Sequence, residues 1–311
     1  MKHWKNIVLP LLLVPVLVTG CIMDDNDDCD NVAIYFQYFA DGDENVLSQY
    51  IDRVDLYVFD EGGHLIEKRP YSREQLGSYQ AIPSFKLIPG KRYKVVAVAN
   101  ADDKTHVTGL ENADFSRMYI QSPEWVAADV VTNHDHNYLG QQEFVMPTGN
   151  FVVYRDTVTM YSSHINTHIE VTGLPAPGAA DITPVTVSID NSNGQTSFEN
   201  EINLDAKGTC APELEYDAAS GKYQTKDLTL YRMDSKGTLL EDYCSHQIVL
   251  KDATGKEMVR FSLYDFIKEN EAYIDVTKQE AYLPIEIQFI ETGITIKLPA
   301  WYVEDITPGW Q

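Results

Sequence analysis

Short stretches in which apolar and polar residues alternate are the dominant pattern of the chain. In residues 53–59, Val54, Leu56 and Val58 fall on one face of an extended strand, with polar or amphipathic residues between them. Residues 60–63 follow with the turn-forming sequence DEGG, and a second extended stretch begins directly afterwards. This pattern predicts a β-hairpin with a four-residue loop.

The same pattern recurs along the whole chain and predicts strands throughout it. We expect strands at residues 32–39, 53–59, 64–67, 85–88, 93–99, 143–146, 151–161, 164–171, 183–189, 198–204, 228–233, 247–251, 258–263, 285–289 and 294–298. Turn-forming residues predict connections at 60–63, 89–90, 191–194, 252–255 and 292–293. Two of these turns predict further hairpins, which pair 85–88 with 93–99 and 183–189 with 198–204. The segment 104–138 is less regular.

Helical signals are few and short. Ser122-Pro123-Glu124 could cap and begin a helix that runs to Ala128. Ser262 is followed three residues later by Asp265, and the apolar residues of the next turn share one helical face. The sequence therefore predicts an all-β protein with one or two short helices.

The number of strands indicates two sandwiches rather than one. Each strand buries one face, so two sheets packed together form the simplest unit, and a mature chain of this length fits two such units. We place the boundary near Ser162-Ser163, which gives an N-terminal β-sandwich domain at 32–162 and a C-terminal one at 163–311.

The N-terminus reads as a lipoprotein signal peptide over residues 1–20. Lys2 and Lys5 precede an apolar run at 7–18, and LVTGC ends at Cys21. The run is too short for a bilayer-spanning helix, which needs roughly 20 apolar residues. We expect cleavage before Cys21 and lipid attachment to its sulfur. The alternative is an ordinary secretory signal with an incidental cysteine.

Residues 21–31 read as an acidic tether that carries no periodicity. One explanation of its aspartates is that the segment is a solvated linker. The alternative is a sorting signal, because acidic residues just after a lipidated cysteine resemble the surface-export signals of Bacteroidota lipoproteins.

The charge of the chain argues against a nucleic-acid partner. The formal net charge is −23, and removing the leader, which contains two lysines, makes it −25. Binding to phosphate backbones would need a basic stripe, but the densest basic groups are only Lys68-Arg69 and residues 91–94. Acidity instead favours solubility at a crowded anionic surface.

Three cysteines follow Cys21, and their spacing matches no zinc or redox motif: Cys29, Cys210 and Cys244. An odd number leaves at least one unpaired in an oxidising compartment. A disulfide between Cys210 and Cys244 and three free thiols both remain open.

The sequence contains no recognisable catalytic or phosphate-binding motif, and we expect no enzyme activity, cofactor or metal. His134-Asp135-His136 could bind a metal, since residues i and i+2 of a strand share a face, but no third ligand is identifiable. A solvated polar loop is the preferred interpretation there. His164 and His168 would be roughly 13 Å apart on the predicted strand.

The layout of the chain resembles the fimbrillin-A-associated anchor lipoproteins of Bacteroidales type V fimbriae. The resemblance rests on the lipobox, YVFDEGG at 57–63, KLIPGKRYKVVAVAN at 86–100 and RFSLYDFIKEN at 260–270. It implies two tandem transthyretin-like β-sandwich domains, lipid attachment to the outer membrane through Cys21, and fimbrillin shaft subunits as partners. It also implies a role in holding the shaft and limiting its length. The family supplies no catalytic residues to transfer.

The C-terminal tail bears on how such a subunit would act. Shaft subunits of the resembled assembly polymerise by strand donation. Here Pro299 and Pro308 remove backbone donors, and the residues between them offer no sustained alternation. We expect this chain not to donate a strand but to terminate the polymer, by accepting a strand or by docking through sheet edges. Packing of 302–307 on the second domain is compatible with that role.

Three other functions remain as alternatives. A surface glycan-binding lipoprotein would be expected to expose tryptophan pairs, whereas the mature chain has only Trp125, Trp301 and Trp310. A fimbrial tip or adhesin component would lie at the distal end of the fimbria. A secreted hydrolase would need a catalytic set that the sequence does not display.

Overall fold

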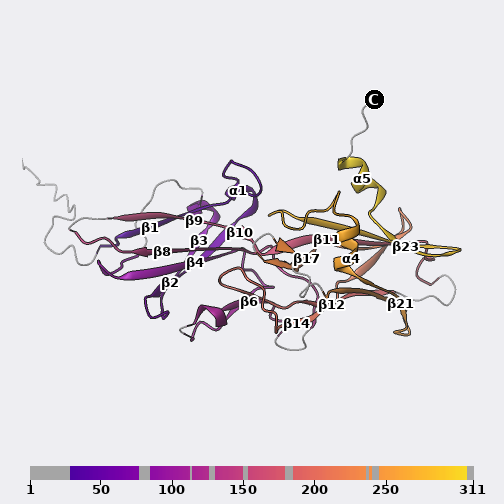
Figure 1. The fold of residues 1–311 in the computed structure, drawn as a ribbon, viewed down its shortest axis with the longest axis horizontal. Helices are drawn as coiled ribbons and strands as arrows, with labels where there is room; N and C mark the ends of the chain where they lie inside the picture. Colours follow the sequence, from indigo (N-terminus) through magenta and orange to yellow (C-terminus); the bar gives the residue numbers. More distant parts are fainter. Residues whose placement is uncertain are drawn as a thin grey trace, which may run out of the picture.

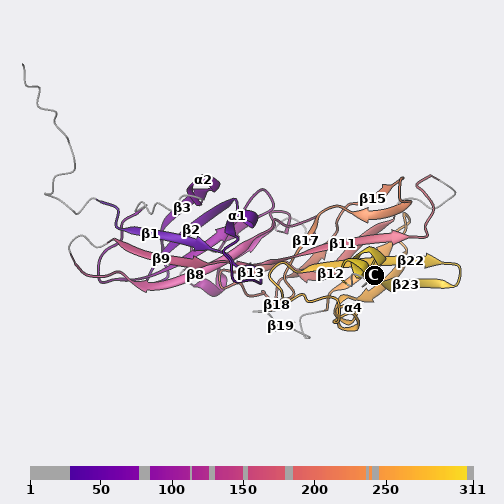
Figure 2. The ribbon, with the colours of Figure 1, turned by 90° about the horizontal axis from the view of Figure 1, so that it is seen from above.

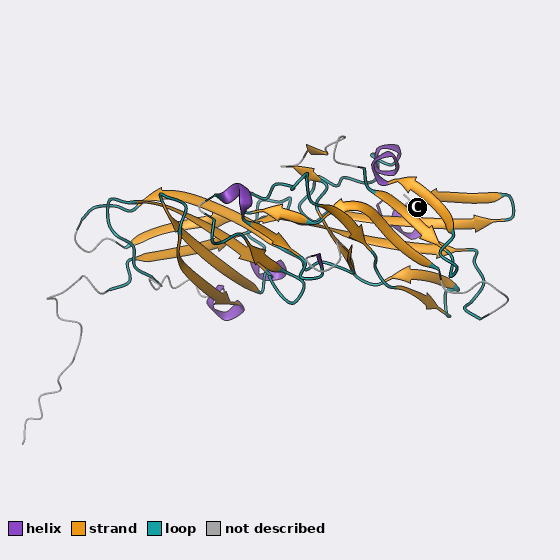
Figure 3. Ribbon diagram, turned by 90° about the horizontal axis from the view of Figure 1, so that it is seen from below, coloured by secondary structure: helices purple, strands orange, loops and turns teal. Residues whose placement is uncertain are grey.

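The computed structural model describes residues 29–76, 85–112, 114–125, 130–149, 153–178, 185–235, 238–239 and 245–306. The all-β prediction is confirmed, because strands dominate and helices are short (Figure 3). The described part of the chain holds four α-helices, more than the one or two expected: α1 Leu47–Tyr50, α2 Arg73–Leu76, α4 Leu263–Glu269 and α5 Ala300–Ile306. The molecule is elongated, and the strands follow its long axis (Figure 1).

The N-terminal half is built around a five-stranded antiparallel sheet in the order β10-β8-β4-β2-β3. A parallel pair, β1-β9, packs against that sheet. The strands of this half are β1 Val32–Gln37, β2 Arg53–Asp60, β3 Leu65–Ser72, β4 Arg92–Ala99, β5 His106–Thr108, β6 Tyr119–Gln121, β7 Val130–Val131, β8 Tyr138–Val145, β9 Tyr154–Thr159 and β10 Tyr161–Ser162, with a short 3₁₀ turn η2 at Phe115–Arg117.

The C-terminal half contains two larger sheets. One is ordered β15-β16-β11-β22-β23, with β17 also paired to β11, and the other is ordered β21-β20-β12-β14-β7. Its strands are β11 His164–Thr172, β12 Thr186–Asn193, β13 Gln195–Ser197, β14 Lys207–Cys210, β15 Leu214–Asp217, β16 Lys222–Thr225, β17 Leu228–Tyr231, β18 Asp234–Ser235, β19 Thr238–Leu239, β20 Gln247–Lys251, β21 Glu257–Ser262, β22 Tyr282–Ile290 and β23 Gly293–Lys297.

Two sheets contain strands from both sides of residues 162–163. β13 pairs with β6, and β14 pairs with β7. The buried Trp125, which precedes the proposed boundary, packs in the core of the C-terminal half. The division into domains at 32–162 and 163–311 stays a proposal.

The predicted β2-β3 hairpin is confirmed, but β2 is not polar on its second face. Asp55 and Tyr57 are buried like the apolar residues between them. The reason is a third apolar cluster on this side of the sheet, in which Tyr57 meets Phe198 of the C-terminal half with ring centroids 5.4 Å apart. A strand covered on both faces loses the alternation that predicted a solvent face.

The predicted pairing of 85–88 with 93–99 is wrong. Phe85 instead forms an isolated bridge to Val32 of β1, while β4 lies between β2 and β8. The Pro89-Gly90 turn does exist, with Gly90 at φ +79°. It therefore redirects the chain between two sheets, so the neighbouring stretches do not pair.

The turn predicted at 191–194 is also wrong, because β12 continues through it to Asn193. Asn191 takes a left-handed conformation with φ +60°, and the register shifts between Asp190 and Ser192. A bulge of this kind lets asparagine sit inside a strand without ending it. β12 then pairs with β14 and β20 instead of with residues 198–204.

The helix predictions have three different outcomes. α4 begins as predicted, with the Ser262 hydroxyl accepting from the Asp265 backbone N–H at 3.2 Å. The helix predicted from 122 to 128 reaches residues 126–128, which lie outside the described ones. The tail forms α5, which the sequence did not predict, and Tyr302 and Val303 pack against the core.

Candidate functional site

Cys21, the one functional residue named from the sequence, lies outside the described residues, as does the signal peptide before it. Of the acidic tether, only residues 29–31 are described, and Cys29 there is exposed and free. The lipid-attachment assignment therefore stays a prediction.

Cys210 differs from Cys29 in its surroundings. It is a free, fully buried thiol at the end of β14, and burial raises its pKa to about 12. Cys244, its alternative disulfide partner from the sequence, falls outside the described part of the chain.

The sequence interpretation of His134-Asp135-His136 as a solvated loop is wrong for its first residue. His134 is only 3% exposed and stacks on Tyr231 of β17, with ring centroids 3.9 Å apart. Neither of its ring nitrogens has a hydrogen-bond partner. Burial lowers the pKa of His134 to about 3, so the ring stays neutral and acts as a packing group.

Asp135 and His136 also contact protein groups. The Asp135 carboxylate accepts from the backbone N–H groups of Asp102 and Lys104, at 3.0 and 3.1 Å, and from the Thr105 hydroxyl at 2.7 Å. His136 stacks on His164, with ring centroids 4.8 Å apart. Within the described ranges, no group of three His, Cys, Asp or Glu side chains is placed to hold a metal ion.

His164 and His168 lie on β11, as the sequence predicted, and do not act together. His164 is buried, its Nδ1 lies 3.0 Å from the Asn137 carbonyl oxygen, and burial lowers its pKa to about 3. His168 instead lies near Trp301 of α5, with ring centroids 6.0 Å apart.

A cavity of about 420 Å³ lies where the two halves meet. β8 and β10 line it from one side, and Phe198, Asn200 and Arg232 line it from the other. Several of its polar groups are engaged with protein partners. The Asn200 amide donates to the Ser162 carbonyl at 3.2 Å, and the Gln279 side chain accepts from the Ser162 N–H at 2.8 Å.

The buried guanidinium of Arg232 also belongs to this junction. Its Nε donates to Asp234 at 2.7 Å, and its two terminal nitrogens donate to the carbonyls of Lys278 and Val276 at 2.9 and 2.6 Å. A charge-assisted network of this kind fixes the segment before β22. It leaves little of the guanidinium available for a ligand.

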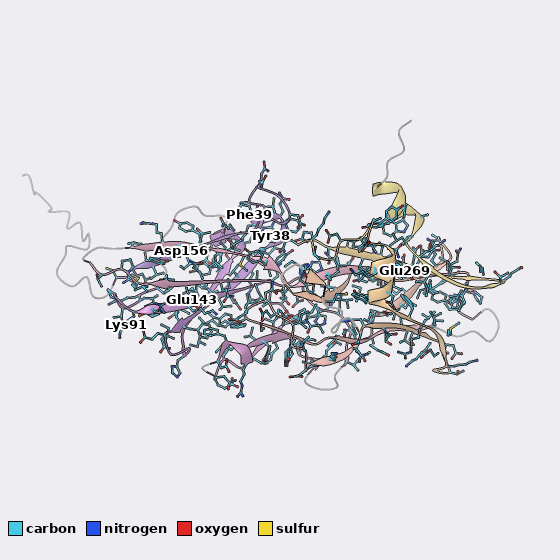
Figure 4. All side chains as sticks on the ribbon, in the orientation of Figure 1. Tyr38, Phe39, Lys91, Glu143, Asp156 and Glu269 are labelled. Atoms are coloured by element: carbon cyan, nitrogen blue, oxygen red, sulfur yellow. The ribbon has the colours of Figure 1, made fainter. Side chains whose placement is uncertain are left out.

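Glu280 forms the most direct link between the halves. Its carboxylate accepts from the hydroxyls of Tyr38, which follows β1, and Tyr138, which begins β8, the second at 3.0 Å. Figure 4 labels Tyr38 at the end of the N-terminal half that faces the C-terminal half. Burial is the main cause that raises the pKa of Glu280 and of both tyrosines.

No pattern in the sequence predicted the contacts of Glu280 with Tyr38 and Tyr138. Tyr38 fell inside a predicted strand and Glu280 in an unassigned loop, 242 positions apart. Only the juxtaposition of β1, β8 and β22 brings the three side chains together.

A second hollow, of about 340 Å³, is polar and acidic. Asp52, Asp102, Asp135 and Asp227 line it beside His134 and Lys104. Burial and the neighbouring Asp135 raise the pKa of Asp102. Because Asp135 is held by its loop contacts, we treat this hollow as a consequence of how the 102–105 loop is anchored.

The two described tryptophans do not form an exposed pair. Trp125 is buried, and Trp301, on α5, is 39% exposed. Trp310 lies outside the described residues. The platform expected of a glycan-binding surface is therefore not seen among the tryptophans that the structure describes.

Comparison of the sequence with known families gives one match. The family of fimbrillin-A associated anchor proteins Mfa1 and Mfa2 matches residues 26–307. A search of curated proteins found no match.

Several solved structures have a similar fold. The fimbrial anchor protein Mfa2 of Porphyromonas gingivalis has a TM-score of 0.62 at 14% identity, over 85% of this chain and 94% of that one. A candidate adhesin of Bacteroides thetaiotaomicron has a TM-score of 0.61 at 17% identity, over 88% and 98%. A candidate polysaccharide-binding protein of the same species has a TM-score of 0.60 at 15% identity, over 87% and 96%.

No helix in the described part of the chain is both long and apolar enough to cross a membrane. The family match covers nearly the whole chain, including both halves of the fold and the junction between them. This chain therefore belongs to the fimbrillin-A associated anchor proteins, a family with a structural role in fimbriae at the cell surface.

Proposed function

We propose that this chain is a non-enzymatic anchor subunit, held in the outer membrane by acyl chains on Cys21, that attaches the fimbrial shaft and limits its length. The observation that carries the proposal is the family match over residues 26–307, which begins five residues after the predicted lipid-bearing cysteine. A lipid on that cysteine would provide the hydrophobic area needed to hold a body of this size at a membrane.

The shape of the molecule supports the proposal. β1 begins near one end of the long axis, and the β22-β23 hairpin projects from the opposite end (Figure 1). A tether at the first end would leave the other end free for a partner. The Glu280 contacts with Tyr38 and Tyr138 join the two halves, which suits a subunit that carries load along its length.

The polar groups at the junction cavity support a non-enzymatic role. Arg232, Asp234 and Gln279 make the contacts that hold the segment before β22. A catalytic acid or base needs a free proton position within reach of a substrate, and these side chains are bound to protein partners.

Deleting the gene tests the anchoring role. Cells without the protein should shed fimbriae into the medium, and the released fimbriae should be longer than those of the parent strain. Electron microscopy of fimbria length and immunoblotting of the medium measure both effects. Fimbriae of ordinary length that stay on the deleted cells would contradict the proposal, and immunogold labelling of the protein at the distal end would favour a tip component.

Lipid attachment is tested by Cys21→Ala. We expect this variant to leave the membrane fraction, because the sulfur that carries the acyl chain is gone. Cys29→Ala is the matched control, since Cys29 is an exposed, free cysteine in the same N-terminal region. Fractionation with detergent phase partitioning separates the two outcomes, and retention of Cys21→Ala in the membrane would refute the lipid assignment.

A further inference from the structure

β23 is the outermost strand of the six-stranded sheet. It pairs antiparallel with β22, with Ile287 opposite Ile296 and Phe289 opposite Ile294. No described strand pairs with β23 on its other side. One row of its backbone N–H and C=O groups therefore faces away from the sheet.

The register identifies which residues present those groups. The two-residue loop at 291–292 closes the hairpin, so its flanking pair, Ile290 and Gly293, exchanges hydrogen bonds. Hydrogen-bonded and non-hydrogen-bonded pairs then alternate, and Thr295 bonds inward to Gln288. The backbone groups of Ile294 and Ile296 are consequently turned outward.

Three other edge strands carry residues that oppose strand addition. β3 contains Lys68, Arg69 and Pro70. β21 carries the exposed ion pair between Arg260 and Glu257, with a nitrogen-to-oxygen distance of 2.9 Å. Charges and proline are the usual means by which proteins protect a sheet edge from pairing.

The edge strand β15 also carries charged residues. β23 differs from β3, β21 and β15 because its outward-facing residues are uncharged. Glu215 and Asp217 lie on the four-residue β15. β23 has the sequence GITIK, and its one charge, Lys297, pairs with Glu286 of β22 at 3.5 Å. Its outward-facing residues are β-branched and uncharged, which favours strand pairing.

Apolar side chains extend beyond the core along this hairpin. Ile287 is buried and Ile296 is half-buried, whereas Ile294 is 43% exposed and Ile290 is 49% exposed. Ile294, opposite Phe289, continues the core face of the sheet past the body of the protein, whereas Ile290 lies on the other face. An added strand with an apolar residue at every second position would cover Ile294.

The hairpin lies at the end of the molecule away from β1. Figure 2, seen from above, shows β22 and β23 projecting beyond the rest of the C-terminal half. A membrane tether that leads into β1 would therefore leave this edge directed away from the lipid.

We propose that β23 is the docking edge for the fimbrial shaft, and that an extended segment of a shaft subunit adds to it as a further strand. The inference rests on the proposed function, because it names the surface through which this anchor would meet its partner. An extended chain fits since only a main chain can satisfy a row of outward N–H and C=O groups. A second copy of this protein is disfavoured as the occupant, because each chain carries a net charge of −23.

The first test is Ile294→Pro, with Ile294→Val as its matched control. Proline removes an outward N–H without breaking the inward bond of Thr295, and proline is tolerated on edge strands. Valine keeps both the N–H and a β-branched side chain. With purified fimbrillin monomer of the same bacterium as the probe, we expect proline to weaken binding about tenfold or more and valine to leave it nearly unchanged.

Ile66→Lys controls for exposed isoleucine in general. Ile66 is 46% exposed and lies on β3, the edge of another sheet. This variant should bind fimbrillin like the unmodified protein, whereas Ile294→Lys should bind less well. Equal losses for the two lysine variants would overturn the assignment of β23.

Hydrogen exchange of the unmodified protein gives a readout that needs no variant. The amides of Ile294 and Ile296 should become protected when fimbrillin binds, while the amide of Ile66 should not. Exchange at Ile294 and Ile296 that fimbrillin does not slow would overturn the proposal, as would fimbrillin binding by Ile294→Pro at full affinity. A fimbrillin-free dimer that Ile294→Pro dissociates would also overturn it, in favour of a second copy.

Failure here is distinguishable from failure of the anchoring role. If Ile294→Pro binds normally while gene deletion still releases long fimbriae, the anchor function stands and its docking surface lies elsewhere. If deletion leaves fimbriae attached and of ordinary length, the anchoring role itself fails.

Discussion

At the scale of single residues, His134 shows how burial decides chemistry. Its position between Asn133 and Asp135 predicts a polar loop, yet the ring is enclosed and stacked on Tyr231. Both nitrogens are without hydrogen-bond partners, which is a cost that an apolar ring of similar shape would not have.

We therefore expect His134→Phe to fold and to be at least as stable as the parent at pH 7. The pKa of His134 in the folded protein is about 3, below its ordinary value of 6.5, so the unfolded chain binds more protons between these two values. Stability from this residue is thus present above pH 6.5 and is lost as the pH falls toward 3.

The phenylalanine variant should lose less stability on acidification than the parent does. Urea unfolding at pH 7 and at pH 4.5 measures the difference. A larger acid effect in the variant, or a loss of stability at pH 7, would show that the histidine ring makes a favourable polar contact.

At the scale of elements, the end of β12 is shaped by a close contact with Trp125. A β-carbon added to Gly194 would lie 2.3 Å from Cη2 of the Trp125 ring. The Asn193 side chain is buried here and donates to the Thr196 hydroxyl at 3.2 Å and to the Arg232 carbonyl at 3.3 Å. The sequence NSNG at 191–194 resembles a turn. In the structure, the absence of a side chain at Gly194 lets the chain between β12 and β13 lie directly against the Trp125 ring.

Gly194→Ala should therefore destabilise the protein by about 1–3 kcal/mol, the usual cost of overpacking a core. It should also shift the emission of Trp125 as the ring moves. Gly42→Ala is a suitable control, because the nearest neighbour of its added β-carbon is 3.7 Å away. Thermal unfolding with tryptophan fluorescence measures both effects, and an unchanged melting temperature for Gly194→Ala would contradict the packing argument.

At the scale of the whole molecule, Glu280 joins the two halves. Its carboxylate is the hydrogen-bond acceptor for two tyrosines that are themselves buried. A nearby contact strengthens the junction, since the Gln279 backbone N–H donates to Asp41 at 3.0 Å. These groups add to the β6-β13 and β7-β14 pairings in fixing the relative placement of the halves.

Glu280→Ala should cost about 1–3 kcal/mol, because two buried hydroxyls lose their acceptor. Glu280→Gln keeps a carbonyl oxygen that both hydroxyls can reach, so it should be far less disruptive at pH 7. Denaturant unfolding of both variants checks this order, and equal losses would show that the negative charge matters more than the acceptor.

The pH dependence of the Glu280 contribution has a definite sign. Its pKa is raised in the folded protein, so the folded state binds more protons than the unfolded state just above pH 4.5, the ordinary pKa of a glutamate. This contribution therefore falls as the pH rises from below 4.5 through the folded pKa. Glu280→Gln should lack that decrease, and a parallel pH profile for parent and variant would contradict the assignment.

Much of the fold follows from local pattern. β2, β4, β11, β20, β22 and β23 lie where alternation or continuous apolar runs predicted strands, and α4 begins at its predicted cap. The family also follows from the sequence layout, since the lipobox and the quoted segments indicate the anchor proteins that the comparison identifies. These features depend on residues that are neighbours along the chain.

The pairings and the junction could not be predicted in that way. Phe85 bridges to Val32, β12 passes through an expected turn, and Tyr38 meets Glu280. Each of these depends on which distant surface covers a residue, and periodicity within one stretch holds no information about its partner.

By itself, the sequence determined most of the strands and the acidity, and it predicted a lipid-bearing N-terminus, because local periodicity, charge count and a contiguous motif carry these properties. Only the tertiary structure decided which faces are buried, how the halves are joined, and which strand is left at an unprotected edge. The physical reason is that burial and backbone pairing are properties of the assembled sheets, in which residues hundreds of positions apart compete for the same neighbours.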